Sequence, residues 1–523
     1  MKRRQFLRNV IPASAIFPSL VNGFTVKAFG AAGFFETLAG AADNDHVFVI
    51  IQLSGGNDGL NTIVPISNYS EYFNLRQNIA IPEGKLLPLN GYAKAGLHPS
   101  MTGMQNMYNQ DQLAILYSVG YPEPDESHFR STDIWLTGAD SNQYLTTGWT
   151  GRFLSTTYEN FPVGYPNATM PDPLAIQIGS MISTVFMGPG GFTAMAAPTD
   201  LDFYGLINAT TDPAPNSPMG TELTYLRTVA RQTNKYADQI VSAAQKAGSQ
   251  SAYPDTYLAA QLKTVSKLIS GGLKTKVYMV SMGGFDTHGS QVQVGNTIAG
   301  NHANLLKDVS DAISAFQTDL TQLGLDKRVI GMTFSEFGRR IMSNGSAGTD
   351  HGAAQPVFLF GEPVKKGVLG NPPDLPSSLD ASSVLPMQYD FRSVYASVLR
   401  DWFCVDPNDI TTMLYKNYQY LPLVETTACN MPVLDTLGDK LIRNDPNPFT
   451  NSTTITFKTN GGNTLIQIFD VSGRLLAVPV NASYTAGEYT TVFYGNSLAA
   501  GVYYARLQNG STQQVRTMIK AGH

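Results

Sequence analysis

Three histidines in polar or glycine-rich loops are the residues of this sequence best suited to chemistry: His128, His288 and His351. Two of them come with a carboxylate, because Asp286 lies two residues before His288 and Asp350 directly precedes His351. Imidazole nitrogens combined with carboxylate oxygens are typical metal ligands, and neighbouring glycines allow the turns that bring them together. We therefore predict a divalent metal site for Zn²⁺, Mn²⁺, Ca²⁺ or Mg²⁺, with both Asp–His pairs as ligands.

Asp58 is a further candidate ligand, in the glycine-rich segment Ser54-Gly55-Gly56-Asn57-Asp58-Gly59. The segment follows an apolar run, residues 47–53, that predicts a buried strand, and Asp58 would be the ligand supplied at its end. The alternative is that Asp58 only builds a turn, as Asp beside Gly commonly does. Both interpretations stay open at this point.

Buried strands and amphipathic helices must position these groups. Continuous apolar runs, typical of strands buried on both faces, occur at Val47–Leu53, Leu113–Tyr117, Val277–Val280, Val329–Phe334 and Val357–Phe360. Tyr257–Ile269 and His302–Leu323 place apolar residues at helical spacing. Strands that alternate with such helices predict an α/β fold, in which a mostly parallel sheet lies between helices.

The polar motifs all follow predicted strands. They occupy residues 54–59, 127–130, 283–289 and 335–340. In open α/β sheets, ligands bind outside the carboxyl ends of the strands. We therefore expect all four segments to converge on one site.

The core of the chain resembles the DUF 1501 family, a set of exported proteins. Between residues 45 and 405, the resemblance rests on Val49–Thr62, Ser127–Phe129, Asp286–Gly289, Gly348–Gly352 and Asp390–Tyr395. That family is similar to the alkaline phosphatase and sulfatase superfamily, which implies an alkaline phosphatase-like fold with metal ligands after the first strand and late in the chain. Asp58 and the pair Asp350 and His351 match those positions. Asp286 and His288 would form the other late pair.

The same resemblance implies a nucleophile at the start of a helix. Sulfatases carry a Cys-x-Pro-Ser-Arg box that ends in Thr-Gly, and this sequence has Ser127–Arg130 followed by Thr137-Gly138 at nearly that spacing. Ser127 is therefore a candidate nucleophile, activated by a metal at a helix start. The alternative is that Ser127 is an N-cap and that His128 is the functional group. Because the Cys-x-Pro-Ser-Arg core is missing, formylglycine chemistry is not expected.

Other charged residues near these motifs have predicted supporting roles. Arg339 or Arg340 would hold the nonbridging oxygens of an ester in a bidentate clamp, unless the two arginines are a surface pair on a helix. Glu336 is a further ligand or a residue that orients one. Asp390 and Arg392 are expected to cap a helix and to form an ion pair.

The N-terminal residues 1–35 are predicted to be a signal peptide. Arg3 and Arg4 precede a short apolar run, residues 11–26, which is typical of the twin-arginine type and makes the twin-arginine translocase an expected partner. The alternative is a membrane anchor. The run contains two prolines and is shorter than the roughly 20 apolar residues that a span needs, so no stable membrane span is expected.

Residues 441–523 predict a separate module, which leaves residues 36–440 for the α/β domain. Short β-rich runs between glycine-containing turns predict a small all-β sandwich; they are Thr453–Phe457, Leu465–Phe469, Thr490–Tyr494 and Gly501–Leu507. The motifs Asn447–Asn451, Ile468–Arg474 and Leu498–Tyr503 resemble the type A sorting domain of the type IX secretion system, which implies that machinery as a partner. The alternative is a carbohydrate-binding β-module, which needs an exposed aromatic platform.

Composition excludes several classes of function. The net charge of −5 provides no basic surface for nucleic acid. Cys404 and Cys429 are the only cysteines, which excludes a cysteine-rich zinc site and an iron–sulfur cluster. In an oxidising compartment the two would form a disulfide; the alternative is two small buried side chains.

Together these features predict an exported protein that reaches the periplasm and then the cell surface or the medium. The leading hypothesis is a metal-dependent hydrolase of phosphate or sulfate esters, in which metal ions stabilise the attacking and leaving oxygens. The alternative is a non-catalytic surface protein that keeps the fold and binds a glycan or an envelope protein. The expected ligand is accordingly a small ester or a glycan.

Overall fold

The chain divides into two compact units, Met1–Asn430 and Met431–His523, and each is described here by itself. The computed structural model describes residues 44–158, 160–201, 233–248, 251–375, 379–425, 429, 440–459, 462–471, 474–484, 487–496, 498–509 and 512–521. The predicted signal peptide, residues 1–35, lies outside the described residues except for two short paired strands, β1 (Ser19–Val21) and β2 (Phe24–Val26).

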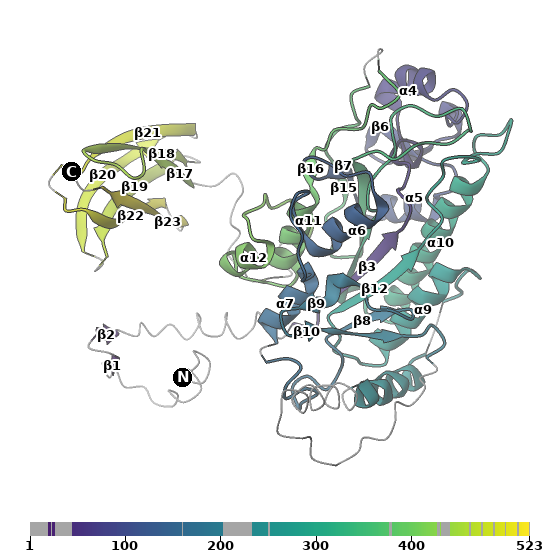
Figure 1. Ribbon diagram of the computed structural model, residues 1–523, viewed down its shortest axis with the longest axis horizontal. Helices are drawn as coiled ribbons and strands as arrows, with labels where there is room; N and C mark the ends of the chain where they lie inside the picture. The colour runs from purple at the N-terminus through teal and green to yellow at the C-terminus, as the bar shows by residue number, and fades with distance from the viewer. Residues whose placement is uncertain are drawn as a thin grey trace. The chain divides into compact units, whose positions relative to one another are not determined.

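A central sheet organises the first unit (Figure 1), and in the described part of the chain it has nine strands. Its order is β11-β8-β12-β3-β13-β14-β7-β15, and β16 also pairs with β7. The bounds are β3 (Val47–Leu53), β7 (Leu113–Gly120), β8 (Ala175–Ile178), β11 (Ala194–Ala197), β12 (Val277–Met282), β13 (Val329–Phe334), β14 (Gln355–Phe360), β15 (Gly367–Leu369) and β16 (Tyr389–Asp390). Neighbouring strands are parallel except around β14. The predicted mostly parallel α/β sheet is therefore confirmed.

Strand β14 is antiparallel to both of its neighbours, β13 and β7. The chain returns from β13 through the loop 335–354, which contains no helix. A parallel return needs a crossover connection, usually a helix, whereas an antiparallel return does not. The connection without a helix is therefore compatible with the reversed direction of β14.

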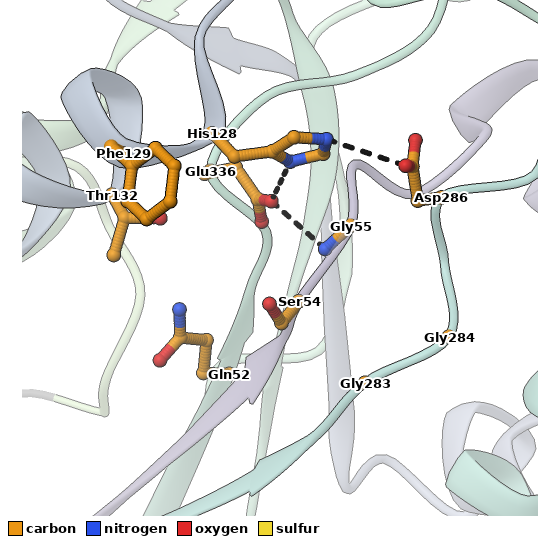
Figure 2. A pocket seen from close by; sticks show the side chains of 10 residues that line it. All are labelled: Gln52, Ser54, Gly55, His128, Phe129, Thr132, Gly283, Gly284, Asp286 and Glu336. Atoms are coloured by element: carbon orange, nitrogen blue, oxygen red, sulfur yellow. Dashed lines mark hydrogen bonds and ion pairs between the residues drawn. The ribbon is translucent and has the colours of Figure 1, made fainter.

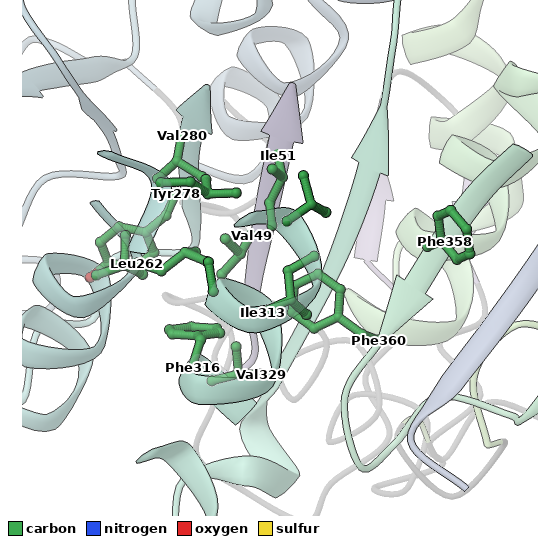
Figure 3. Close-up of a cluster of buried hydrophobic side chains, with 14 of the residues drawn as sticks. Val49, Ile51, Leu262, Tyr278, Val280, Ile313, Phe316, Val329, Phe358 and Phe360 are labelled. Atoms are coloured by element: carbon green, nitrogen blue, oxygen red, sulfur yellow. The ribbon is translucent and has the colours of Figure 1, made fainter. Parts of the chain in front are cut away.

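Both faces of the sheet are buried, as the continuous apolar runs predict. Along β3, Val49 and Ile51 belong to one hydrophobic cluster, while Phe48 and Ile50 belong to the other. Helices α5 (Thr102–Asn109), α9 (Tyr257–Ser270) and α10 (Asn301–Gln322) cover the first face, and Figure 3 shows Leu262 and Phe316 packed there. Helices α6 (His128–Thr137), α7 (Trp149–Thr157), α11 (Phe391–Ser397) and α12 (Pro407–Leu414) cover the second face (Figure 1). Among the described helices, none combines the length and the apolar composition required for a membrane crossing.

Two interactions secure the C-terminal part of this unit. Asp390 accepts a hydrogen bond from the backbone N–H of Arg392 and pairs with its guanidinium at 2.7 Å, so the predicted cap and ion pair of α11 are confirmed. Cys404 and Cys429 form a disulfide. A disulfide stabilises a fold mainly by restricting the unfolded chain, and this one suits the oxidising compartment expected for an exported protein.

The second unit is entirely β-structure in its described residues. Its strands are β17 (Lys440–Asp445), β18 (Ser452–Thr459), β19 (Gly462–Asp470), β20 (Leu475–Tyr484), β21 (Gly487–Tyr494), β22 (Gly501–Asn509) and β23 (Thr512–Lys520). They form two antiparallel sheets, β17-β18-β21 and β20-β19-β22-β23. One core joins the two sheets, with Phe457 of β18 and Phe493 of β21 beside Ile468 of β19 and Leu507 of β22. The predicted all-β sandwich is confirmed.

Candidate metal centre

The polar segments meet beyond the carboxyl ends of β3, β12 and β13 and at the start of α6. Gly55, after β3, has a φ of 123°, and a Cβ at this position would lie 2.3 Å from the backbone nitrogen of Asp286. Only glycine permits so close an approach in this conformation. The backbone N–H of Gly55 also donates to Glu336 Oε1 at 2.8 Å, which joins it to the segment after β13. The expected convergence of the motifs therefore occurs.

Asp286 lies at the centre of this meeting point. Its Oδ1 atom lies 3.2 Å from Nε2 of His288 and 3.2 Å from Nε2 of His351. Its Oδ2 atom lies 3.5 Å from Nε2 of His128 (Figure 2). Burial raises the pKa of Asp286, but the hydrogen bond and charge of Arg339 outweigh it, so the pKa falls below its ordinary value. The carboxyl group is therefore a carboxylate at neutral pH, and three imidazoles face it.

Each of these imidazoles directs its other nitrogen, Nδ1, to an oxygen acceptor outside the cluster. The contacts are His128 to Glu336 Oε1 at 2.7 Å, His351 to the Glu126 carbonyl at 2.8 Å, and His288 to Asp350 Oδ1 at 2.9 Å. An oxygen acceptor beside Nδ1 places the ring proton on Nδ1. In the neutral rings, Nε2 then carries the lone pair that a metal uses.

The inner groups of the cluster are consequently all acceptors. Nε2 of His288 lies 2.9 Å from Nε2 of His351, and two lone pairs at that distance repel unless a proton or a metal ion lies between them. Burial lowers the pKa of His351, which favours its neutral form and so disfavours the proton. A cation satisfies the arrangement, and it would join two or three imidazoles to one carboxylate.

The donor set fits a divalent metal. The ligand atoms of His128, Asp286 and His351 all lie within 4.8 Å of one another, and His288 adjoins them. Nitrogen and oxygen donors of this kind suit Zn²⁺ or Mn²⁺. Of the predicted ligands, Asp286, His288 and His351 are brought together, and Asp350 supports His288 from behind. His128, predicted as a catalytic residue, is a ligand candidate in this geometry.

Arg339 holds the loops together rather than facing the pocket. The side chain is buried, and it donates to the carbonyls of Gly55, Gly56, Phe285 and Thr349 as well as to the Asp286 carboxylate at 2.7 Å. Residues 335–340 form no helix, so the alternative of a surface pair on a helix is wrong. Because Arg339 is buried, bonds these backbone carbonyls and does not line the pocket, it is not placed for the predicted ester clamp. Arg340 pairs with Glu126 at 3.1 Å and donates to the His351 carbonyl.

Ser127 and His128 have different locations, although they are adjacent. Ser127 occupies the N-cap position of α6, is exposed, and donates its backbone N–H to Asp125 Oδ1 at 2.7 Å. Its side chain is not among those that line the pocket, whereas His128 is. Glu336 is buried and orients His128 through Nδ1, which is the second of its two predicted roles.

The structure does not bring Asp58 to this cluster. Its carboxylate is buried and accepts hydrogen bonds from Arg76 at 2.9 Å and from the Gln291 amide at 2.6 Å. Burial raises the pKa of Asp58, but Arg76 outweighs this effect, and the pKa is lowered. Asp58 is thus the carboxylate of a buried ion pair at the start of the short helix α3 (Gly59–Thr62).

A pocket of about 430 Å³ opens beside the cluster (Figure 2). His128, Asp286 and Glu336 lie at one side of it, and the remaining lining residues are Gln52, Ser54, Gly55, Phe129, Thr132, Gly283 and Gly284. Sequence reasoning singled out neither Gln52 nor Thr132 for the site. The signal for Gln52 was present, because it is the polar residue in an otherwise apolar strand.

Several solved structures from bacteria are similar to this chain. One, from work on the metabolism of multiple glycosaminoglycans by Bacteroides thetaiotaomicron, is 12% identical and matches 91% of this chain and 89% of its own, with a TM-score of 0.35. A sulfatase from Pseudoalteromonas sp. is 10% identical, and the match covers 89% of this chain and 87% of that one, with a TM-score of 0.34. A protein in the alkaline phosphatase superfamily from Vibrio parahaemolyticus is 10% identical, and the match covers 82% of this chain and 81% of that one, with a TM-score of 0.32. These TM-scores lie below 0.5, and no property of this chain follows from them. No curated protein matches the chain significantly.

Two family models match the sequence. Residues 204–414 match the family described as a protein of unknown function, DUF1501. Residues 446–521 match the secretion system C-terminal sorting domain, which indicates delivery to the cell surface or secretion through the type IX machinery. Both resemblances predicted from the motifs are confirmed. The chain is therefore similar to the DUF1501 family over residues 204–414 and to a secretion sorting domain over residues 446–521.

Proposed function

We propose that the chain is an exported metal-dependent ester hydrolase whose active site is the pocket beside Asp286. The observation that carries this proposal is the convergence of three Nε2 atoms on one carboxylate at an open pocket. A site built only to stabilise a fold is closed, whereas a catalytic site keeps a position open to solvent and substrate. Asp286 is 48% exposed, so this centre is open.

The metal supplies two things when bound: charge that stabilises the transition state, and activation of a water molecule near neutral pH. The residues of the chain supply the geometry. Glu336 and Asp350 fix the orientation of His128 and His288, and Arg339 fixes Asp286. Imidazole rings whose Nδ1 donates a hydrogen bond in this way are fixed in one tautomer and bind a metal more strongly.

Water is the proposed nucleophile, in place of Ser127. Ser127 is not among the described residues that line the pocket, and it is not part of the group that could hold a metal. Replacement of Ser127 by Ala is therefore expected to leave the rate of ester hydrolysis within about threefold of the wild-type rate, since a lost nucleophile costs far more. A loss of a hundredfold or more would restore Ser127 as the nucleophile.

The charge of the pocket favours a substrate with one negative charge or none. No Lys or Arg is among the described residues that line it, and Asp286 and Glu336 are both acidic. A doubly charged phosphate monoester would depend on the metal alone for neutralisation. Sulfate monoesters and phosphate diesters, which are monoanions, are therefore the proposed class.

The test combines metal analysis with turnover by the purified full chain. We expect about one divalent ion per chain, and hydrolysis of an aryl sulfate or a diaryl phosphate in preference to an aryl phosphate. His128→Ala and His351→Ala should lose both metal and turnover. His46→Ala is the matched control, because His46 stacks on Trp402 and is not among the metal-ligand candidates. Turnover that survives in both ligand variants, or a metal-free inert wild type, would overturn the proposal.

A further inference from the structure

The pocket has an aromatic wall that the ester chemistry does not explain. Phe129, the second residue of α6, is 92% exposed and lines the pocket. His128 and Thr132, which also line it, lie one residue before and three residues after Phe129 on the same helix. Thr132 lies on the same side of the helix as His128, four residues before it, and as Phe129, three residues before it. All three line the pocket, so the first turn of α6 presents an imidazole, a phenyl ring and a hydroxyl to it (Figure 2).

Three neutral polar side chains surround this ring without internal partners. Within the described ranges of the chain, no residue forms a hydrogen bond with the side chains of Gln52, Ser54 or Thr132, although all three line the pocket. Gln52 interrupts the apolar sequence of β3, and its half-buried side chain lines the pocket. An amide and two hydroxyls provide both donors and acceptors to a ligand.

We infer that this pocket is a subsite for a saccharide ring, which packs one face on Phe129 and directs its ester toward Asp286. A sugar ring has an apolar C–H face and a rim of hydroxyl groups, and the pocket has one aromatic face and a rim of neutral polar groups. The absence of Lys and Arg from the described lining residues fits a ring that is itself uncharged. The part of the inference that concerns the ester rests on the proposed function. The part that concerns binding of the sugar ring does not.

Binding of neutral sugars to the metal-loaded full chain tests this inference. The probes are the monosaccharides and β-linked disaccharides of glucose, galactose, mannose and N-acetylglucosamine, with phenol as the probe for a simple aromatic ligand. We expect at least one disaccharide to bind, and Phe129→Ala to weaken it by about tenfold, the order of effect that a lost aromatic contact produces. Phe129→Trp should keep the affinity within about threefold.

Tyr257→Ala is the matched control, because Tyr257 is also an exposed aromatic residue near the start of a helix and does not line the pocket. The affinity of the Tyr257→Ala variant for the saccharide should equal that of the wild type. Binding of phenol with no binding of any saccharide would overturn the inference, as would an affinity that Phe129→Ala leaves unchanged.

Repeating the titration on His351→Ala separates this inference from the proposed function. Sugar binding that persists in this variant and still depends on Phe129 supports the subsite even if the wild type hydrolyses no ester. Ester hydrolysis by a wild type that binds no sugar supports the proposed function and rejects the subsite.

Discussion

Two carboxylates of the first unit, Asp58 and Asp286, have similar partners and opposite environments. Each pairs with a buried arginine, Asp58 with Arg76 at 2.9 Å and Asp286 with Arg339 at 2.7 Å. Asp58 is 1% exposed, whereas Asp286 is 48% exposed. The same pair of residue types is therefore a part of the core in one place and a part of an open site in the other.

The difference lies in what else faces each carboxylate. Asp58 accepts from N–H groups of Arg76 and Gln291, so its negative charge meets donors. Asp286 meets one such donor, from Arg339, and otherwise faces the Nε2 atoms of histidines whose protons are held on Nδ1. A buried carboxylate that accepts from an arginine and an amide is a structural ion pair, although Asp58 Oδ1 has no hydrogen-bond partner among the described residues. A carboxylate that faces three imidazole nitrogens without protons is incomplete without a cation. Exposure and the positions of ring protons, more than residue type, distinguish the two.

The largest expected effect comes from Asp286→Ala. This change removes the shared ligand of the cluster, so metal content should fall to background and ester turnover by at least about a thousandfold, ~4 kcal/mol in activation free energy. The unfolding free energy of the metal-free protein should fall by less than in Asp58→Ala, because Asp286 is half exposed and solvent screens its pairing with Arg339. Elemental analysis, turnover and denaturant titration measure the three quantities. Full metal content in the variant would contradict the account.

Asp58→Ala should show the reverse pattern. Removing this carboxylate leaves the Arg76 guanidinium buried without its counterion, which is expected to cost about 3–5 kcal/mol of unfolding free energy. The folded fraction should still hold its metal, because Asp58 does not lie in the cluster. Denaturant unfolding combined with metal analysis of the folded protein checks both parts. Metal loss without destabilisation would make Asp58 a ligand after all.

The pH dependence of the unfolding free energy should come in part from the buried histidines His302 and His98. Burial lowers the pKa of His302 to about 4 and that of His98 to about 3, from an ordinary 6.5. The unfolded chain therefore binds these protons at a higher pH than the folded chain does. Stability should be fully present above pH 6.5 and fall as the pH drops toward 4, by an amount on the order of 2–3 kcal/mol for His302.

His302→Gln tests this dependence, since glutamine is polar and does not titrate. Unfolding free energies of the metal-free variant and wild type, measured from pH 4.5 to 7.5, should show a smaller slope for the variant. Equal slopes would mean that His302 does not contribute.

The smallest expected effect comes from the residues that accept hydrogen bonds from the Nδ1 atoms of the ligand histidines. Glu336→Gln keeps an oxygen for His128 Nδ1 but removes the charge, and metal affinity should fall by about 10- to 100-fold. Glu126→Gln is the control, because Glu126 holds His351 through its backbone carbonyl, which the substitution retains. Competition with a chelator measures both affinities. Equal affinities in the two variants would remove Glu336 from the metal centre.

Much of the scaffold could be predicted because it depends on local pattern. The runs Val47–Leu53 and Val329–Phe334 are strands with the predicted bounds, since runs this rich in apolar residues are stable only where both faces are covered. The reversed direction of β14 could not be predicted from its own residues. It depends on the loop before it, whose residues 335–354 form the site instead of a crossover helix.

The site was predicted where its residues are sequence neighbours or follow the strands of the predicted sheet. Asp286 and His288 act together because only Thr287 separates them in a glycine-rich loop. Asp58 looked equivalent, but its partner Arg76 is 18 residues away at the end of helix α4 (Tyr69–Leu75), and no spacing rule connects the two. Arg339 was misjudged for the same reason, because the carbonyl groups that surround it come from three separate loops.

X-ray absorption spectroscopy of the purified full chain tests the metal centre most directly. The account predicts about one divalent ion per chain, with only nitrogen and oxygen neighbours at about 2.0–2.2 Å and multiple-scattering features of at least two imidazoles. The same spectrum should be absent from a His128→Ala, Asp286→Ala, His351→Ala triple variant. A chain without stoichiometric metal, or a triple variant with the wild-type spectrum, would contradict the account.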